Sequence, residues 1–225
     1  MKILALIPAR AGSQTVKNKN IKIYKKKPLI YHSIAIAKKS KLINRIIVST
    51  DSKLYANICK RFGAEIPFLR PKNISNHSST DKSWVMHATN FLKRKENYIP
   101  DIIVHLRPTT PNRDAKVIDA GIKFFLKNYS KSTSMRSVSI FSQPPQKLFK
   151  MKNKYLHGFF NKTLKGEYHN YPRQHFSQTY LPNGYIDILK PEFFLNSKYL
   201  HGNKILAYIT QQTNDIDLPI DFIKS

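Results

Sequence analysis

The chain has 225 residues, of which 41% are hydrophobic, and 39 basic residues against 13 acidic ones give a formal net charge of +26. This length favours a single α/β domain over residues 1–225, and two small domains are the alternative. No apolar stretch approaches the roughly 20 residues that span a bilayer, so we expect no stable membrane insertion. Such a charge is typical of nucleic-acid binding. However, lysine outnumbers arginine 30 to 9, and no zinc-ligand or helix-turn-helix spacing accompanies the charge, so we expect no nucleic-acid partner.

Short β-rich runs alternate with amphipathic segments through the first half of the chain. In chain order, the pattern predicts a strand over Lys2–Ile7, a helix over Leu29–Lys39, a strand over Arg45–Ser49, helices over Ser52–Phe62 and Ser83–Lys93, a strand over Asp101–Leu106 and a helix over Asp114–Asn128. Strands that alternate with helices imply a parallel sheet with right-handed crossovers. The sequence therefore predicts an α/β fold.

The α/β rhythm breaks between about residues 135 and 180, where short β-like pieces are rich in Tyr, His, Phe and Gln. We interpret this segment as an excursion from the sheet that forms a lid or a dimer contact. The α/β pattern resumes at Tyr185–Leu189 and Ile205–Ile209 and closes around Asp221–Ile223.

The first apolar run and the cysteine content both bear on the compartment. Ile3–Ile7 is shorter than the apolar core of roughly 7–15 residues in a secretory leader, and Pro8 and Arg10 follow at once, so we expect a strand there. The single cysteine, Cys59, cannot form an internal disulfide. This favours a cytoplasmic, reducing compartment, with Cys59 as a core residue of its helix.

Three polar clusters follow predicted strand ends, at residues 8–20, 50–51 and 107–113. In parallel sheets, ligands bind beyond the carboxyl ends of the strands. We therefore expect the three clusters to converge on one edge of the sheet.

The opening loop, within ALIPARAGSQTVKNKN (residues 5–20), has neither the P-loop pattern nor the three glycines of a dinucleotide fold. It does place the backbone amides of Gly12 and Ser13 where a phosphate can approach, with Arg10 and Lys19 to neutralise its charge. The loop is thus a candidate phosphate site, and an ordinary solvated strand–helix loop is the alternative.

The segment LRPTTPNR, residues 106–113, contains two prolines that stiffen it and two threonines that supply hydroxyls. By itself this pattern favours a plain turn before a helix, and a rigid wall of a ligand site is the alternative.

The segment NDIDLPIDF, residues 214–222, places Asp215 and Asp217 two residues apart. In a strand this spacing points both side chains the same way, and paired carboxylates suit Mg²⁺ that is shared with substrate phosphates. We expect a magnesium site here, and the alternative is a solvated edge strand.

Taken together, these motifs resemble the acylneuraminate cytidylyltransferases, the CMP-sialic acid synthetase family. The resemblance runs in order along essentially the whole chain, through IPARAGS…KNKNI, KPLI, IIVSTDS, GAEIPFLRP, LRPTTPNR, PNGYIDI and DIDLPIDF. It implies a Rossmann-like nucleotidyltransferase fold, with a mostly parallel sheet flanked by helices and a small β-rich dimerisation excursion. It also implies Mg²⁺-dependent transfer of CMP from CTP to a nine-carbon sugar acid, with release of pyrophosphate, by a homodimer.

The resemblance assigns a role to residues along the whole chain. The residues implied to bind the nucleotide are Arg10, Gly12, Ser13, Gln14, Lys19, Asn20, Arg70, Ser79 and Asp81. Those implied to bind the sugar acid are Arg107, Thr109, Lys147, Arg173 and Asn183. Asp215 and Asp217 are implied to hold the metal, and Arg10, Lys19 and Asp215 form the implied catalytic set.

The chain departs from the family pattern at three positions. Gln14 stands where the family usually has a lysine, and Lys17 is near enough in sequence to replace that cation. Arg107 stands where sialic-acid enzymes commonly have glutamine, and Tyr185 where they have alanine. Both of these changes fall in the implied sugar site, and they favour a legionaminic-, pseudaminic- or other modified ulosonic acid as the acceptor.

Two other functions stay open. Gln14 is also consistent with a catalytically weak or inactive homologue that binds nucleotide or sugar without transfer. The other alternative is a nucleotidyltransferase that uses another nucleotide or a sugar phosphate. Arg173 argues against it, because a carboxylate clamp has little use for an acceptor that is already a phosphate.

Overall fold

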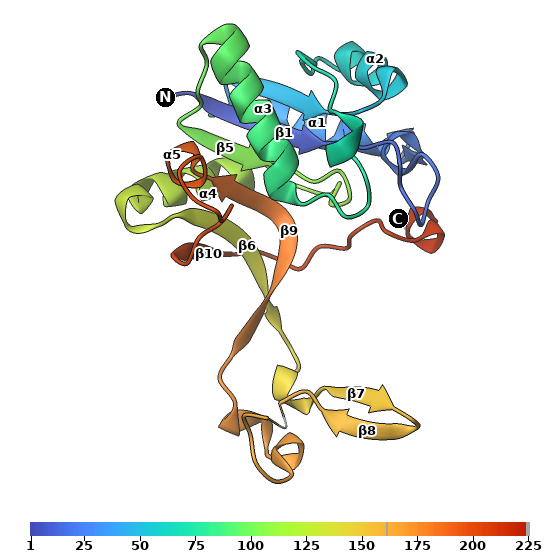
Figure 1. Cartoon of the computed structure of the whole chain (residues 1–225), viewed down its shortest axis with the longest axis vertical. Helices are drawn as coiled ribbons and strands as arrows, with labels where there is room; N and C mark the ends of the chain where they lie inside the picture. Colours follow the sequence, from blue (N-terminus) through green and yellow to red (C-terminus); the bar gives the residue numbers. More distant parts are fainter. Residues whose placement is uncertain (161, 224–225) are drawn as a thin grey trace.

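A computed structural model describes residues 1–160 and 162–223 of the chain. A six-stranded sheet in the order β10–β6–β9–β5–β1–β4 forms the centre of the fold (Figure 1). Its strands are β1 (Ile3–Pro8), β4 (Arg45–Ser49), β5 (Ile102–His105), β6 (Ser134–Phe141), β9 (Thr179–Leu189) and β10 (Ile205–Ile209). Five of these strands run in one direction, and β9 runs against both of its neighbours. The predicted mostly parallel sheet is confirmed.

Helices cover both faces of this sheet. They are α1 (Leu29–Lys39), α2 (Lys53–Arg61), α3 (Asp81–Glu96), α4 (Ala115–Lys127) and α5 (Pro191–Phe194). Along β1, Ile3 and Ile7 pack in one core with buried residues of α1, α2 and α4, whereas Leu4 and Leu6 pack in a second core with α3 and α5. This alternation follows from the two-residue period of a strand. It produces the three layers of helix, sheet and helix.

The four predicted helices correspond to α1, α2, α3 and α4, whereas α5 was not predicted. The longest of them, α3, begins at Asp81, two residues before its predicted start, because the hydroxyl oxygen of Thr80 accepts a hydrogen bond from the backbone N–H of Ser83 at 3.3 Å. Asp114 caps α4 in the same way through the N–H of Lys116. Cys59 is a free, buried residue on α2, as expected.

Short elements connect the larger ones. Two small strands, β2 (Ile23–Tyr24) and β3 (Lys27–Pro28), form a hairpin beside α1. The 3-10 turns are η1 (Lys19–Ile21), η2 (Lys72–Ile74), η3 (Tyr129–Lys131), η4 (Pro145–Lys147), η5 (Tyr168–Asn170), η6 (Arg173–His175) and η7 (Pro219–Phe222). Among the described residues, no helix is long and apolar enough to cross a membrane.

The excursion is an arm that projects away from the rest of the molecule (Figure 1). We call residues 142–178 the arm, and the sheet with its helices the body. The arm carries a hairpin of β7 (Phe149–Lys152) and β8 (Tyr155–Gly158). It is shorter than the expected range of about 135 to 180, because β6 and β9 stay paired with each other as far out as Phe141 and Thr179.

The carboxy-terminal segment differs from the prediction. Residues 210–218 form no strand, and the expected closing element at 221–223 belongs to the turn η7 and the residue after it. The segment is held instead by side-chain packing, because Ile216 and Phe222 contact Tyr24 and Leu29. Asp215 and Asp217 therefore lie on an irregular segment rather than on an edge strand.

Candidate functional site

A cavity of about 380 Å³ lies beyond the carboxyl ends of β1 and β5, and we call it the edge cavity. It brings together ten of the predicted site residues: Arg10, Ser13, Gln14, Lys19, Asn20, Arg70, Ser79, Asp81, Arg107 and Thr109. Arg10 and Lys19 bring positive charge to it from the opening loop, and Arg70 does so from the other side. The expected convergence of the strand-end loops is confirmed.

Hydrogen bonds to the end of β4 hold the opening loop in place. The N–H of Ala9 donates to the carbonyl of Ser49 at 2.9 Å, and the N–H of Ala11 donates to Oδ1 of Asp51, also at 2.9 Å. Farther along, the side-chain amide of Asn20 donates to the carbonyl of Arg10 at 3.0 Å. The loop is therefore fixed against the sheet at several points, which favours a built ligand site over an ordinary solvated loop.

Arg70 forms the floor of the edge cavity. Only 4% of it is exposed, and its guanidinium donates to the hydroxyl oxygen of Ser49 at 3.0 Å and to the carbonyl of Ser49 at 2.7 Å. The guanidinium also lies 5.1 Å from the ring centroid of Trp84, a cation–π contact. Trp84 lines the cavity as well. Sequence reasoning missed it, because a single tryptophan on a helix reads as a core residue.

The carboxy-terminal segment contacts both sides of the edge cavity. Oδ1 of Asp217 accepts from Nζ of Lys19 at 2.7 Å, and Oδ1 of Asp215 accepts from the hydroxyl of Thr110 at 2.6 Å. Between them, the N–H of the buried Ile216 donates to the carbonyl of Thr109 at 2.7 Å. The two carboxylates thus lie next to the opening loop and the proline loop, where the resemblance places a metal.

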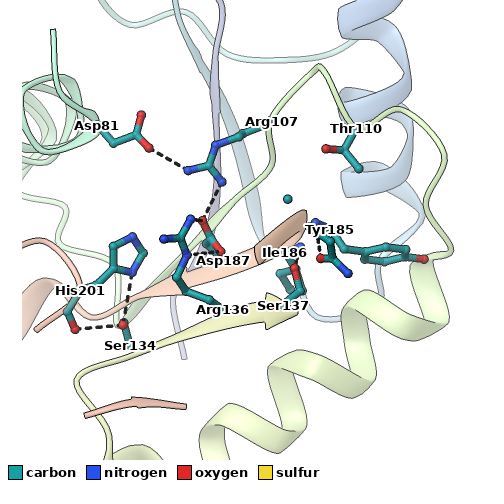
Figure 2. A network of polar contacts seen from close by, with 12 residues as sticks. Asp81, Arg107, Thr110, Ser134, Arg136, Ser137, Tyr185, Ile186, Asp187 and His201 are labelled. Atoms are coloured by element: carbon teal, nitrogen blue, oxygen red, sulfur yellow. Dashed lines mark hydrogen bonds and ion pairs between the residues drawn. The ribbon is translucent and has the colours of Figure 1, made fainter. Parts of the chain in front are cut away.

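An ion-pair network crosses the wall of the edge cavity, and Figure 2 shows its members. Arg107 donates to Oδ2 of Asp81 at 2.8 Å and to Oδ2 of Asp187 at 2.7 Å. Arg136 contacts Asp187 as well, at 3.3 Å. Burial opposes the ionisation of Asp187, but the guanidinium groups of Arg107 and Arg136 hold the pKa of this carboxyl below its usual range. The network is therefore charged on both sides and balanced.

His105 lies beside this network on β5. Its ring stands edge-on to Trp84, with the centroids 5.1 Å apart. Burial, together with the nearby charge of Arg107, lowers the pKa of His105 to about 3, so the ring is neutral at pH 7. In the part of the chain that the structure describes, neither ring nitrogen has a hydrogen-bond partner.

Arg113 and Gly184 were not predicted, and both shape the proline loop. The guanidinium of Arg113 donates to the carbonyls of Tyr185, Gly184 and Arg107 at 2.6 to 2.9 Å, which ties the loop to β9. Gly184 has φ +68°, and a Cβ there would lie 2.8 Å from the hydroxyl oxygen of Thr110. The PNGYIDI motif contained this signal, since glycine after asparagine often marks a left-handed backbone position.

Several predicted residues lie outside the lining of the edge cavity. Asn183 is buried and uses its side chain to donate to Thr210 and to the carbonyl of Gln211. Gly12 is exposed, and a Cβ there would meet open space, so the fold does not require glycine at this position. Lys17 is also exposed and does not line the cavity, whereas Gln14 does.

Lys147 and Arg173 are in the arm, which Figure 1 shows extending away from the body. Arg173 lines a separate hollow of about 430 Å³ at the base of the arm, together with Phe141 and Thr179. Within one chain, the structure therefore does not bring these two cations to the edge cavity. The reason is that the pairing of β6 with β9 carries the arm outward.

Tyr185 does not belong to the edge cavity either. It is 7% exposed and packs in the core on the α4 face, and its phenolic oxygen accepts from the N–H of Asp114 at 2.6 Å. Figure 2 shows its ring directed away from Arg107. Its side chain serves the start of α4, and a role of Tyr185 in the sugar site stays a prediction.

A mixed sheet between helix layers, with a basic cavity at the strand ends, defines a Rossmann-like nucleotidyltransferase fold. A CMP-2-keto-3-deoxy-manno-octonic acid synthetase solved in complex with CTP has the same fold. It superposes with a TM-score of 0.72 at 15% identity and covers all of this chain and 96% of that one. At this identity the likeness concerns the fold alone.

The cytidylyltransferase family model matches residues 4–165, and the chain belongs to this family. It is 30% identical to an N-acylneuraminate cytidylyltransferase of Escherichia coli over 96% of the chain and 49% of that protein. It is 40% identical to a CMP-N,N'-diacetyllegionaminic acid synthase of Legionella pneumophila over 52% of the chain and 50% of that protein. The chain thus spans about half the length of these two relatives.

Proposed function

We propose that the protein transfers CMP from CTP to a nonulosonic acid and releases pyrophosphate. The observation that supports this most is the edge cavity, where cations from the opening loop meet Arg70 and the proline loop. The named activities of the two relatives act on sugar acids of this class. The Legionella pneumophila relative is named for a legionaminic acid, and this favours a modified acceptor such as legionaminic or pseudaminic acid.

In the proposed reaction, the anomeric hydroxyl oxygen of the sugar acid attacks the α-phosphorus of CTP. A new O–P bond forms, the bond from the α-phosphorus to the bridging oxygen breaks, and pyrophosphate leaves with that oxygen, while the hydroxyl proton passes to solvent. Arg10 and Lys19 neutralise the triphosphate, and Ser13 positions it from the same loop. The protein contributes mainly orientation and charge neutralisation, which is the usual balance in phosphoryl transfer.

Two carboxylates of the carboxy-terminal segment, which contact Lys19 and Thr110, suit a magnesium ion. Asp215 and Asp217 supply carboxylate oxygens, the ligands that Mg²⁺ prefers, and Mg²⁺ is usually held by one or two carboxylates plus substrate phosphates. No group of three or more His, Cys, Asp or Glu residues that could hold a metal occurs among the described residues, so the remaining ligands would come from phosphates and water. A bound Mg²⁺ would supply charge stabilisation on the phosphates.

We further propose that the protein acts as a homodimer in which the arm reaches the partner subunit. Lys147 and Arg173 would then meet the sugar acid in the partner's cavity, with Arg173 as a carboxylate clamp. The exposed apolar side chains of the arm support this proposal, because Met151, Tyr155 and Leu156 are 75%, 73% and 66% exposed in the single chain. Light scattering of the purified protein measures the oligomeric state directly.

Pyrophosphate release from CTP, with Mg²⁺ and a panel of ulosonic acids, tests the proposed activity. Release with one sugar, abolished in Asp215→Ala/Asp217→Ala, is the expected result and identifies the acceptor. Asp114→Ala/Asp119→Ala is the matched control, since these carboxylates accept from the backbone N–H groups of Lys116 and Lys41 and not from Lys19 or Thr110. No release with any sugar, despite CTP binding, would favour a homologue that binds without transfer.

Gln14 lines the edge cavity in place of the family lysine, and Lys17 is not among the lining residues. The loss of one preorganised cation of this kind lowers turnover by about a hundredfold. We therefore expect Gln14→Lys to raise kcat. An unchanged kcat in Gln14→Lys would mean that another cation, such as Lys19, already meets the charge.

A further inference from the structure

Arg107 is the cation of the edge cavity whose charge is most fully used by the protein itself. Its two terminal nitrogens donate to two different carboxylates, Asp81 at the first residue of α3 and Asp187 on β9. Asp187 is 1% exposed, so it cannot turn to solvent. Burial works against the charge of Arg107, but the two carboxylates raise its pKa above the ordinary value. A guanidinium held in this way has little charge left for a ligand.

The contacts continue from Arg107 to the opposite side of the edge cavity. Asp81 uses its second oxygen, Oδ1, to accept from the indole N–H of Trp84 at 3.1 Å. Trp84 in turn lies under the guanidinium of Arg70. Burial alone would raise the pKa of Asp81, but the charge of Arg107 and the hydrogen bond from Trp84 hold it below its usual range, so the carboxylate stays ionised.

A continuous set of contacts therefore connects Asp187 on β9 to Arg70, and it passes through Arg107, Asp81 and Trp84. Asp81 begins α3, and the residues just before it form part of the nucleotide side of the cavity, where Ser79 lies. From these contacts we infer that Arg107 is a positioning residue for the nucleotide. It anchors the first turn of α3 to the central sheet, and through Asp81 and Trp84 it fixes Arg70 on the floor of the cavity.

This inference rests on the proposed function for the identity of the nucleotide, and it changes the role that the resemblance implied. A ligand of the sugar acid at position 107 would affect binding of the acceptor. A positioning residue that acts through Asp81 would affect binding of CTP instead. The two roles are separable by measuring the affinities for CTP and for the acceptor independently.

The first experiment measures the dissociation constant of CTP by calorimetry for Arg107→Gln and Asp187→Asn, without any acceptor. We expect each single variant to weaken CTP binding by about tenfold. The double variant should bind CTP as tightly as the single variant with the lower affinity, because both changes release the same contact. Arg136→Gln is the matched control. It removes a guanidinium from the same Asp187 at a position that neither contacts Asp81 nor lines the cavity, and CTP affinity should change by less than about twofold.

Arg107→Lys keeps the charge but cannot reach both carboxylates, so it should weaken CTP binding in the same direction by a smaller factor. It also serves if Arg107→Gln does not fold, which thermal unfolding will show. With an active acceptor, the KM for CTP should rise while the KM for the sugar acid changes little. The inference is overturned if Arg107→Gln or Arg107→Lys raises the KM for the sugar acid and leaves CTP affinity unchanged, or if Asp187→Asn binds CTP like the wild type.

Because CTP binding is measured without turnover, the proposed function and this inference fail separately. If the protein binds CTP but transfers CMP to no sugar, the proposed function is contradicted. The positioning role of Arg107 is still tested by the CTP affinities of its variants. Unaltered CTP affinity in the Arg107 and Asp187 variants of an active enzyme contradicts the positioning role alone.

Discussion

In the body, the polar side chains around the edge cavity are held by neighbouring groups, whereas in the arm large apolar side chains face solvent. Arg70 is 4% exposed and bonded to Ser49, while Met151 is 75% exposed on a two-stranded hairpin. An isolated hairpin of this size is marginally stable in water. The body is thus preorganised by its own contacts, whereas the arm leaves large apolar side chains exposed in the single chain.

The largest effect should come from mixing subunits. We expect Lys19→Ala in the cavity and Arg173→Ala in the arm each to lower kcat/KM by at least about a hundredfold, because each removes a cation that meets a substrate charge. If the arm serves the partner's cavity, co-expression of both variants restores about a quarter of wild-type activity, since half of the dimers are mixed and each mixed dimer has one intact site.

The control for this experiment is a mixture of each variant with itself, which should stay inactive. Recovery absent from the mixed sample would mean that the arm does not complete the partner's cavity. Full activity of Arg173→Ala alone would mean that Arg173 makes no substrate contact.

This contrast also separates what the sequence could predict from what it could not. The loops at residues 8–20 and 107–113 were placed correctly, because the carboxyl ends of parallel strands share an edge whatever the details of packing. The helices were placed correctly from their periodicity and caps. The sequence could not predict where Lys147 and Arg173 lie relative to the cavity. Their position depends on how far β6 and β9 stay paired, and no local sequence pattern marks where this pairing ends.

The residues that hold the lining of the edge cavity in place were also not identified from the sequence. Arg113 acts through a hydrogen bond to the carbonyl of Tyr185, and Asp187 through its ion pair with Arg107. Trp84 acts through its hydrogen bond to Asp81, three positions earlier in the sequence. A sequence shows the types of these residues but not their partners. Tyr185 is the opposite case, since its position in the motif suggested a ligand contact and tertiary packing directed it to α4 instead.

Gly184 sharpens the contrast in stability. Alanine there would require a left-handed conformation, at a cost of about 1 kcal/mol, and would also push against Thr110 at 2.8 Å. We expect Gly184→Ala to lower the free energy of unfolding by roughly 2–3 kcal/mol and to reduce turnover by displacing Thr110 from Asp215. Urea denaturation and the pyrophosphate assay measure the two effects.

Gly63 in the body is the matched control, with φ +88° and only the end of the flexible Lys38 side chain near the point where a Cβ would lie. Gly63→Ala should show the conformational cost alone, about 1 kcal/mol, with unchanged turnover. Equal destabilisation by the two substitutions would show that the contact with Thr110 is not tight.

The pH dependence of stability should come mainly from the body. His105 has a folded-state pKa of about 3, below the unfolded value of about 6.5, so the unfolded chain binds the extra proton between these values. Its contribution is fully present above pH 6.5 and is lost as the pH falls toward 3, by up to about 1.4 kcal/mol per pH unit. His105→Phe keeps the ring against Trp84 and should flatten this loss.

Denaturant unfolding of the wild type and of His105→Phe from pH 7 to pH 5 measures the difference. His157→Phe in the arm is the control, because this histidine is exposed and its replacement should leave the pH profile unchanged. Parallel pH profiles for the wild type and His105→Phe would contradict a neutral, buried His105.

The smallest effects should come from two hairpin turns that have the same backbone conformation. Lys25 and Lys26 have φ +46° and +65° between β2 and β3, and Asn153 and Lys154 have φ +48° and +69° between β7 and β8. Turns of this kind favour glycine at the second position. Lys26→Gly should raise the free energy of unfolding of the body by about 0.5–1 kcal/mol, because β2 and β3 pack beside α1 and unfold with it. Lys154→Gly should not move that transition, since its hairpin belongs to the arm, and an equal shift in both variants would show that arm and body unfold as one unit.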